Sequence, residues 1–150
     1  MSQAADDYDS PWKEAIHRFF PDFLQFFYPQ VHQDIDWSVP HRFLDRELRK
    51  VTRNSVQGNR RVDTLIEVQS LSRGAQWLLI HLEVQSQHDA KLEARMLLYN
   101  ARARDHFQRT VASFVILADS SSNWRPTSFH DTIWDCSLKL EFMMRKLIDY

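Results

Sequence analysis

Residues 77–87 read WLLIHLEVQSQ. The run is apolar at first, and its polar residues Glu83 and Gln85 are two positions apart, so they lie on the same face of a strand. A second run, RVDTLIEVQ at residues 61–69, lies just upstream and carries Asp63. Both runs have the length and alternation of β-strands, and the turn-forming sequence SRGA separates them. The two runs are therefore predicted to form an antiparallel hairpin.

The predicted hairpin brings two carboxylates together. In a turn centred near residue 73, Asp63 lies as far upstream as Glu83 lies downstream, so the two side chains face each other to within a residue or two. A carboxylate inside a covered sheet loses its hydration and needs a cation as partner. Mg²⁺ prefers one or two carboxylates with water and phosphate oxygens, so the pair predicts a metal site for phosphodiester cleavage. Gln85 lies on the same face and is predicted to orient the attacking water without deprotonating it.

The residues before the hairpin predict mainly helices. Residues 1–10 are acidic and are predicted to be a disordered lead, after which Ser10-Pro11 is typical of a helix start. Aromatic side chains then recur at helical spacing, with a break or kink expected near Phe20 because Pro21 follows. The next predicted segments are a connection at 29–40, a helix at 41–51 that allows a short strand at 41–45, and a turn at 54–60.

The residues after the hairpin predict a helix at 89–108 and a strand buried on both faces at 110–118. A loop is expected at 119–127 and a short strand within 133–140, whereas the last ten residues show no clear pattern. The order of helices, hairpin, helix and buried strand predicts an α/β fold with a mixed sheet flanked by helices.

Composition limits the classes of protein. The chain of 150 residues is long enough for one domain with a substantial core. It has only two glycines, which excludes glycine-rich phosphate loops and therefore a nucleotide cofactor of that kind. Its one cysteine, Cys136, is expected to be buried and indicates a cytoplasmic location. No apolar run reaches the ~18 residues that cross a bilayer, so no membrane partner is expected.

Positive charge gathers just before and at the start of the hairpin. Residues 42–61 contain two acidic side chains against seven basic ones, namely Arg42, Arg46, Arg49, Lys50, Arg53, Arg60 and Arg61. Such a cluster fits either a phosphate backbone or a solvated helix face. The seven histidines show no zinc-ligand spacing. His81 shares the face of Glu83 and has two interpretations, a hydrogen-bonded histidine lining the sheet or a residue that orients a ligand.

The arrangement of Asp63, a strand–turn–strand and Glu83-Val84-Gln85 resembles the signature of the PD-(D/E)XK nuclease superfamily. More narrowly, the chain is similar to the recombination-promoting nuclease and transposase-like (YhgA-like) family. This resemblance rests on the ordered segments SPWKEAIHRFFPDFL, RRVDTLIEV, LLIHLEVQSQ, ARMLLYNARARD and VILADSSSNWRP.

The resemblance implies a restriction-endonuclease-like αβββαβ core over residues 11–150. It also implies DNA cleavage with Mg²⁺ or Mn²⁺ in recombination or transposition. Asp63 and Glu83 fall on the metal-binding carboxylates of the superfamily, and Gln85 falls on a position that is usually lysine. Members of the narrower family are usually longer, so a truncated C-terminus is expected, and a dimer is one open oligomeric state.

Further residues complete the predicted site. Glu14 falls on an additional acidic position of the superfamily, and Glu67 is the spare carboxylate if the hairpin register slips. The predicted DNA contacts are Arg60, Arg61, Arg95, Tyr99 and Arg102.

Two alternatives stay open from the sequence. Gln85 in place of lysine favours an inactive nuclease-fold module that binds DNA or a transposition partner. The other alternative is a structural domain whose carboxylates pair with Arg60, Arg61 or Arg95.

Overall fold

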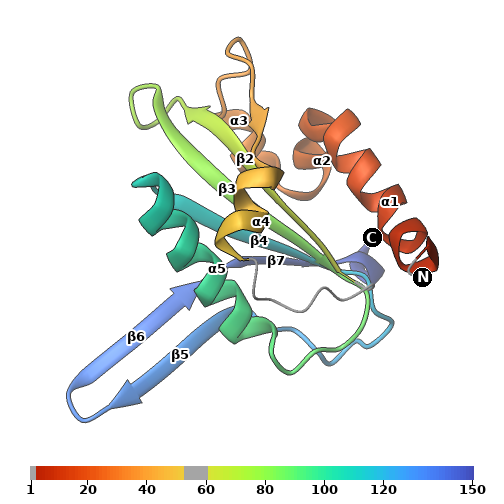
Figure 1. Ribbon diagram of the computed structural model, residues 1–150, viewed down its shortest axis with the longest axis vertical. Coiled ribbons are helices and arrows are strands. Elements are labelled where there is room, and N and C mark those ends of the chain that lie inside the picture. The colour runs from red at the N-terminus through yellow and green to blue at the C-terminus, as the bar shows by residue number, and fades with distance from the viewer. Residues whose placement is uncertain (1–2, 53–60) are drawn as a thin grey trace.

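The fold is a mixed five-stranded β-sheet with helices on both faces (Figure 1). The computed structural model describes residues 3–52 and 61–150. Its helices are α1 (Gln3–Arg18), α2 (Phe20–Phe27), α3 (Pro29–Asp34), α4 (Asp45–Val51), α5 (Leu92–Phe107) and the short 3-10 helix η1 (Leu147–Asp149). Its strands are β1 (Arg42–Phe43), β2 (Arg61–Ser70), β3 (Gln76–Gln85), β4 (Val111–Leu117), β5 (Ser128–Ile133), β6 (Cys136–Glu141) and β7 (Met143–Lys146). The predicted α/β class and mixed sheet are confirmed.

The strand order of the sheet is β1-β2-β3-β4-β7. The first three strands are antiparallel neighbours, whereas β4 lies parallel to β3 and β7 parallel to β4. The predicted β2–β3 hairpin is confirmed, and its turn contains two left-handed residues, Gly74 and Ala75, with φ of 66° and 64°. The helix α5 makes the crossover that lets β3 and β4 run parallel.

Alternation along the strands divides the core between the two faces of the sheet. Even-numbered residues of the hairpin, such as Ile66 and Ile80, pack with the apolar residues of α1, α2 and α3. Odd-numbered residues, such as Leu65 and Leu79, pack with α4 and α5. Since the period along a strand is two residues, every odd-numbered residue of the hairpin faces the α4–α5 side.

The N-terminal helices differ from the prediction at their start. The helix α1 begins at Gln3, whereas the sequence predicts a disordered lead over residues 1–10 and a start at Ser10-Pro11. Alanines and acidic residues fill these early positions, and both suit the N-terminal end of a helix. The predicted break near Phe20 is confirmed, since α1 ends at Arg18 and α2 begins at Phe20. None of the helices in the described residues is long and apolar enough to cross a membrane.

The predicted connection at residues 29–40 contains a helix that the sequence pattern did not reveal. Pro29 occupies a position at the start of α3, where its fixed φ favours a helix instead of breaking it. Both elements allowed for residues 41–51 are present, with β1 at Arg42–Phe43 followed by α4. The predicted turn at residues 54–60 lies outside the described residues.

The chain after β4 forms a second, separate sheet. Strands β5 and β6 pair with each other as an antiparallel hairpin that projects beyond α5 (Figure 1). The sequence predicts one strand within residues 133–140, where the structure has the end of β5, a turn at Trp134 and β6. The prediction that Cys136 is buried is wrong, because this residue begins β6 on the projecting hairpin and is exposed.

Candidate metal centre

The register of the hairpin places the two predicted carboxylates opposite each other. Asp63 pairs with Glu83, and Arg61 pairs with Gln85 at the neighbouring odd-numbered positions. Directly opposed residues in antiparallel strands have Cβ atoms about 5 Å apart. All four side chains face the α4–α5 side of the sheet, as the odd-numbered positions require. The predicted meeting of Asp63 and Glu83 is confirmed.

Glu83 is held by one arginine from α5. Its side chain is fully buried, and Arg95 donates from Nε to Oε1 at 3.2 Å and from Nη2 to Oε2 at 2.6 Å. The same guanidinium donates to Asp89 at 2.8 Å and to Gln85 at 3.4 Å. This bidentate contact is the strong form of the arginine–carboxylate pair. Both oxygens of Glu83 accept a hydrogen bond from Arg95.

Asp63 has different partners and keeps some access to solvent. Arg61 Nε donates to its Oδ2 at 2.9 Å, and His81 Nε2 lies 3.4 Å from its Oδ1. Arg61 also reaches the hydroxyl of Tyr99 at 3.3 Å, with its guanidinium 5.8 Å from the centre of that ring. The side chain of Asp63 is 15% exposed, in contrast to the fully buried Glu83.

The two carboxyl groups have opposite pKa shifts. Burial raises the pKa of Glu83, the charge of Asp63 raises it further, and Arg95 offsets only part of this change. Burial also acts to raise the pKa of Asp63, but the hydrogen bond from His81 and the charge of Arg61 hold that pKa below its usual range. Divergent pKa values in a neighbouring pair are typical of functional sites.

His81 joins the carboxylates in one cluster. One ligand atom from each of Asp63, His81 and Glu83 lies within 4.8 Å of the other two. His81 is fully buried and stands two residues before Glu83, on the same face of β3. This is the single group of at least three such side chains that could hold a metal ion among the side chains that the structure describes, in residues 11–52 and 61–150.

Local structure explains why Arg95 reaches the sheet. The carboxylate and carbonyl of Asp89 accept hydrogen bonds from the backbone N–H groups of Lys91 and Leu92 at 2.9 and 3.1 Å. These bonds fix the start of α5, where free N–H groups need acceptors. Arg95 and Tyr99 are four residues apart in that helix, so both project toward the same part of the sheet.

A small cavity opens beside Asp63. It has a volume of about 80 Å³, and its lining includes three basic side chains, Lys13, Arg49 and Arg61. Lys13 comes from α1 and Arg49 from α4, so two helices contribute cations at the edge of β2. Arg61 pairs with Asp63, which also lines the cavity, and Lys13 lies 3.9 Å from Asp45, so Arg49 adds the excess positive charge that favours an anionic group there.

The two spare acids of the prediction do not join this centre. Glu14 is exposed on α1 and forms an ion pair with Arg18 at 4.0 Å, because the buried residue of this turn is Ile16. Glu67 faces the α4–α5 side but lies further along β2, where Arg42 and Arg109 form ion pairs with it.

The predicted DNA-binding residues have internal partners. Arg61 and Arg95 pair with the carboxylates of the centre, and Tyr99 is buried and accepts a hydrogen bond from Arg61. Arg102 donates to the carbonyl of Val51 at 3.3 Å, which joins α5 to the end of α4. Arg60 lies outside the described residues. Contact of Arg61 or Arg95 with phosphate therefore requires their ion pairs to open.

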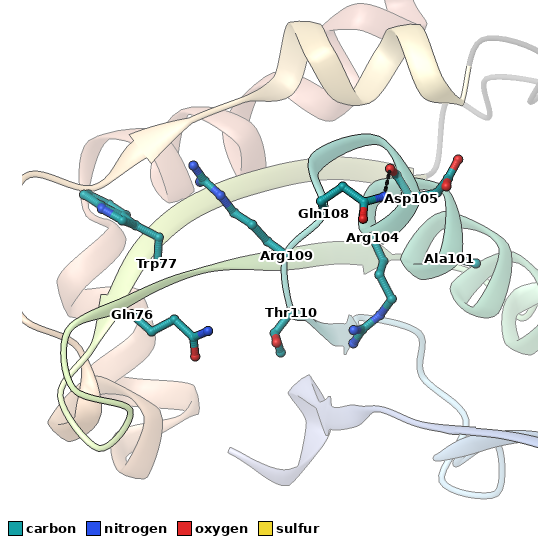
Figure 2. Close-up of a pocket in the computed structure, with 8 residues that line it drawn as sticks. All are labelled: Gln76, Trp77, Ala101, Arg104, Asp105, Gln108, Arg109 and Thr110. Atoms are coloured by element: carbon teal, nitrogen blue, oxygen red, sulfur yellow. Dashed lines mark hydrogen bonds between the residues drawn. The ribbon is translucent and has the colours of Figure 1, made fainter.

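A second, larger cavity lies at the opposite end of β3. Its volume is about 570 Å³, and Figure 2 shows Trp77, Arg104 and Arg109 among its lining residues. Arg109 is paired with Glu67, and Asp105 is the only carboxylate in the lining of this cavity. It therefore lacks the paired acids that distinguish the first site.

Comparison with family models, with curated proteins and with solved structures finds no match for this chain. The family resemblance of the sequence therefore stays a prediction, and the geometry of the centre carries the functional argument.

Three residues contribute to the site in ways that the sequence pattern did not reveal. His81 was predicted either to line the sheet beside Glu83 or to orient a ligand, and its phase with Glu83 was the signal for a shared cluster. Arg49 belonged to the basic cluster of residues 42–61, but the sequence could not place Arg49 or Lys13 beside Asp63, because only the packing of α1 and α4 against β2 brings them there.

Replacing Arg95 tests the electrostatic balance of the centre. Arg95→Ala leaves Glu83 buried beside Asp63 without its cation, which is expected to destabilise the fold by about 3–5 kcal/mol. The pKa of Glu83 rises further, so the variant loses stability as the pH increases above the ordinary glutamate range of about 4. Urea unfolding across pH measures both effects.

The matched controls separate charge from packing. Adding Glu83→Gln to Arg95→Ala removes the unpaired charge and is expected to restore much of the stability. Arg125→Ala breaks the exposed pair with Asp149 and should change stability far less. Equal destabilisation by Arg95→Ala and Arg125→Ala would contradict this description of the centre.

Proposed function

We propose that this protein is a divalent-metal-dependent DNA endonuclease of the PD-(D/E)XK type, with its active site at Asp63 and Glu83. The observation that carries the proposal is the cross-strand pair of these carboxylates beside a cation-lined cavity. The carboxylate pair suits a metal ion, and the cation-lined cavity suits a phosphate. Metal-dependent phosphodiester hydrolysis needs the metal ion and the phosphate next to each other.

The order of elements supports the same proposal. Helices α1 to α3 precede three antiparallel strands, β1 to β3, and then come α5 and the parallel strand β4. This order corresponds to the αβββαβ core of restriction-endonuclease-like enzymes, with α4 added between β1 and β2. The family resemblance adds a role in recombination or transposition and a cytoplasmic location to the proposal.

The residues of the centre fit a divalent cation. Ligand atoms of Asp63, His81 and Glu83 lie within 4.8 Å of one another, and two ligands of one Mg²⁺ ion lie at most about 4.2 Å apart. A small inward movement therefore suffices. When bound, such an ion lowers the pKa of coordinated water and stabilises negative charge on the phosphoryl group.

The side chains around the carboxylates have separate roles in the proposed reaction. Lys13, Arg49 and Arg61 bind the phosphate in the cavity beside Asp63. Gln85 donates from Nε2 to the carbonyl of Gln87 at 2.8 Å, which turns its Oε1 toward Arg95. That oxygen orients a water by accepting a hydrogen bond, and the uncharged amide takes no proton from it.

One observation favours a second function, a module that binds DNA without cutting it. Arg95 occupies both oxygens of Glu83, and Gln85 stands where the superfamily usually has lysine. If Arg95 stays in place, its guanidinium competes with a metal ion for the oxygens of Glu83. A plasmid-cleavage assay and a DNA-affinity assay distinguish the two functions.

Cleavage is tested on supercoiled plasmid with Mg²⁺ or Mn²⁺. Wild-type protein is expected to nick the plasmid only with metal, and Asp63→Asn and Glu83→Gln should lower the rate at least ~100-fold. Glu67→Gln is the matched control, because Glu67 is a buried, ion-paired acid on the same face of β2. If the plasmid stays intact with the wild type and all variants and its mobility shifts equally, the nuclease is excluded and the DNA-binding module is supported.

DNA affinity tests the cation-lined cavity. Lys13→Ala with Arg49→Ala is expected to weaken binding of duplex DNA and to reduce the slope of log affinity against log salt by about 1 for each phosphate that is no longer neutralised. Arg104→Ala, in the second cavity, should leave that slope unchanged. Fluorescence anisotropy in EDTA measures binding without cleavage, and an unchanged slope in the double variant would rule out this phosphate site.

A further inference from the structure

The imidazole of His81 is incompletely bonded in a fully buried position. Its Nε2 faces Asp63 Oδ1 at 3.4 Å, whereas its Nδ1 has no hydrogen-bond partner. Among the described residues, Nδ1 is the one buried side-chain nitrogen or oxygen without a partner. Native proteins satisfy nearly all such atoms, so an exception calls for a ligand or another explanation.

The contact of Nε2 with Asp63 accounts for one nitrogen of the ring, and the rest of the surroundings supply no partner for Nδ1. Leu65 is its cross-strand neighbour on β2, and the ring of Tyr99 meets it edge-on with centroids 5.5 Å apart. An apolar side chain would pack at this position without an unsatisfied nitrogen. The histidine instead stands beside two carboxylates, with a ligand atom of each residue inside the 4.8 Å cluster.

We propose that His81 is the third protein ligand of the centre, which therefore binds a first-row transition-metal ion such as Mn²⁺ in preference to Mg²⁺. This inference rests on the metal centre of the proposed function and adds the class of metal to it. Mg²⁺ favours oxygen ligands and keeps several waters, whereas imidazole nitrogen suits transition-metal ions. Mn²⁺ accepts carboxylates as readily as Mg²⁺ does, so two carboxylates and one imidazole favour it.

The charges of the centre agree with a dication. Arg61 and Arg95 balance the negative charge of Asp63 and Glu83 in the described structure, and Arg95 also pairs with Asp89. A dication between the carboxylates takes over that balance. Arg95 then releases an oxygen of Glu83 and keeps its contact with Asp89 at 2.8 Å.

Metal binding is measured first without DNA. Titration calorimetry of the full chain with MnCl₂ and MgCl₂ is expected to show at least ~10-fold tighter binding of Mn²⁺. Pulsed electron paramagnetic resonance of the Mn²⁺-loaded protein should show modulation from a directly bonded nitrogen. Mn²⁺ bound without nitrogen modulation, or no Mn²⁺ binding at all, would overturn the proposal. Both measurements use the wild-type chain, so they do not depend on the folding of a variant.

The variant His81→Gln then assigns the nitrogen. It keeps a neutral side chain that has an oxygen ligand, and we expect it to lose the nitrogen modulation and the preference for Mn²⁺ while Mg²⁺ affinity changes little. His106→Gln, on the exposed surface of α5, is the control. Retention of the preference for Mn²⁺ in a folded His81→Gln protein would contradict the assignment.

The assignment of His81 as a metal ligand and the proposed nuclease activity are refuted by different results. Mn²⁺ with a bonded nitrogen but no plasmid cleavage supports His81 as a ligand and refutes the nuclease. Plasmid cleavage at limiting Mn²⁺ that is equally fast in wild type and His81→Gln supports the nuclease and refutes the assignment of His81.

Discussion

The fixed register of the β2–β3 hairpin places Asp63 and Glu83 opposite each other on a covered face of the sheet. Two carboxylates at such a distance repel, and burial removes the water that would screen them. The surrounding structure answers this constraint, with Arg61 from the same strand, Arg95 from α5 and His81 from the facing strand. A sheet built only for stability would place apolar residues at these positions, as it does nearby at Leu65 and Leu79.

In the described structure, Arg61 and Arg95 form ion pairs with the two carboxylates of the centre. Glu83 is fully buried and both of its oxygens accept from Arg95, whereas Asp63 keeps 15% exposure and adjoins the cavity lined by Lys13 and Arg49. A ligand therefore reaches the centre from the Asp63 side. A dication held by Asp63 and Glu83 would supply positive charge and would make the contact of Arg95 with Glu83 dispensable. Asp89 retains Arg95 close to the centre after that exchange.

The sequence predicted the hairpin and its paired acids because both depend on local rules. Alternation and a turn with Gly74 set the register, so the position of Asp63 opposite Glu83 follows from counting residues. Arg95 was predicted to contact DNA, with pairing to a carboxylate of the centre as an open alternative, and the structure shows the pairing with Glu83. Spacing along a helix could not decide between the two. Lys13 and Arg49 depend on how two separate helices pack at the edge of β2, which no local pattern encodes. The early start of α1 and the β5–β6 hairpin were missed because their sequences carry weak periodicity.

The proposed function depends on Asp63 and Glu83 sharing one metal ion. Anomalous X-ray scattering from crystals soaked in Mn²⁺, collected on either side of the manganese absorption edge, locates the ion directly. We expect a single strong peak between the two carboxylates, with Arg95 displaced from at least one oxygen of Glu83. Crystals that contain Mn²⁺ at other positions, while Arg95 still donates to both oxygens of Glu83, would contradict a shared metal ion.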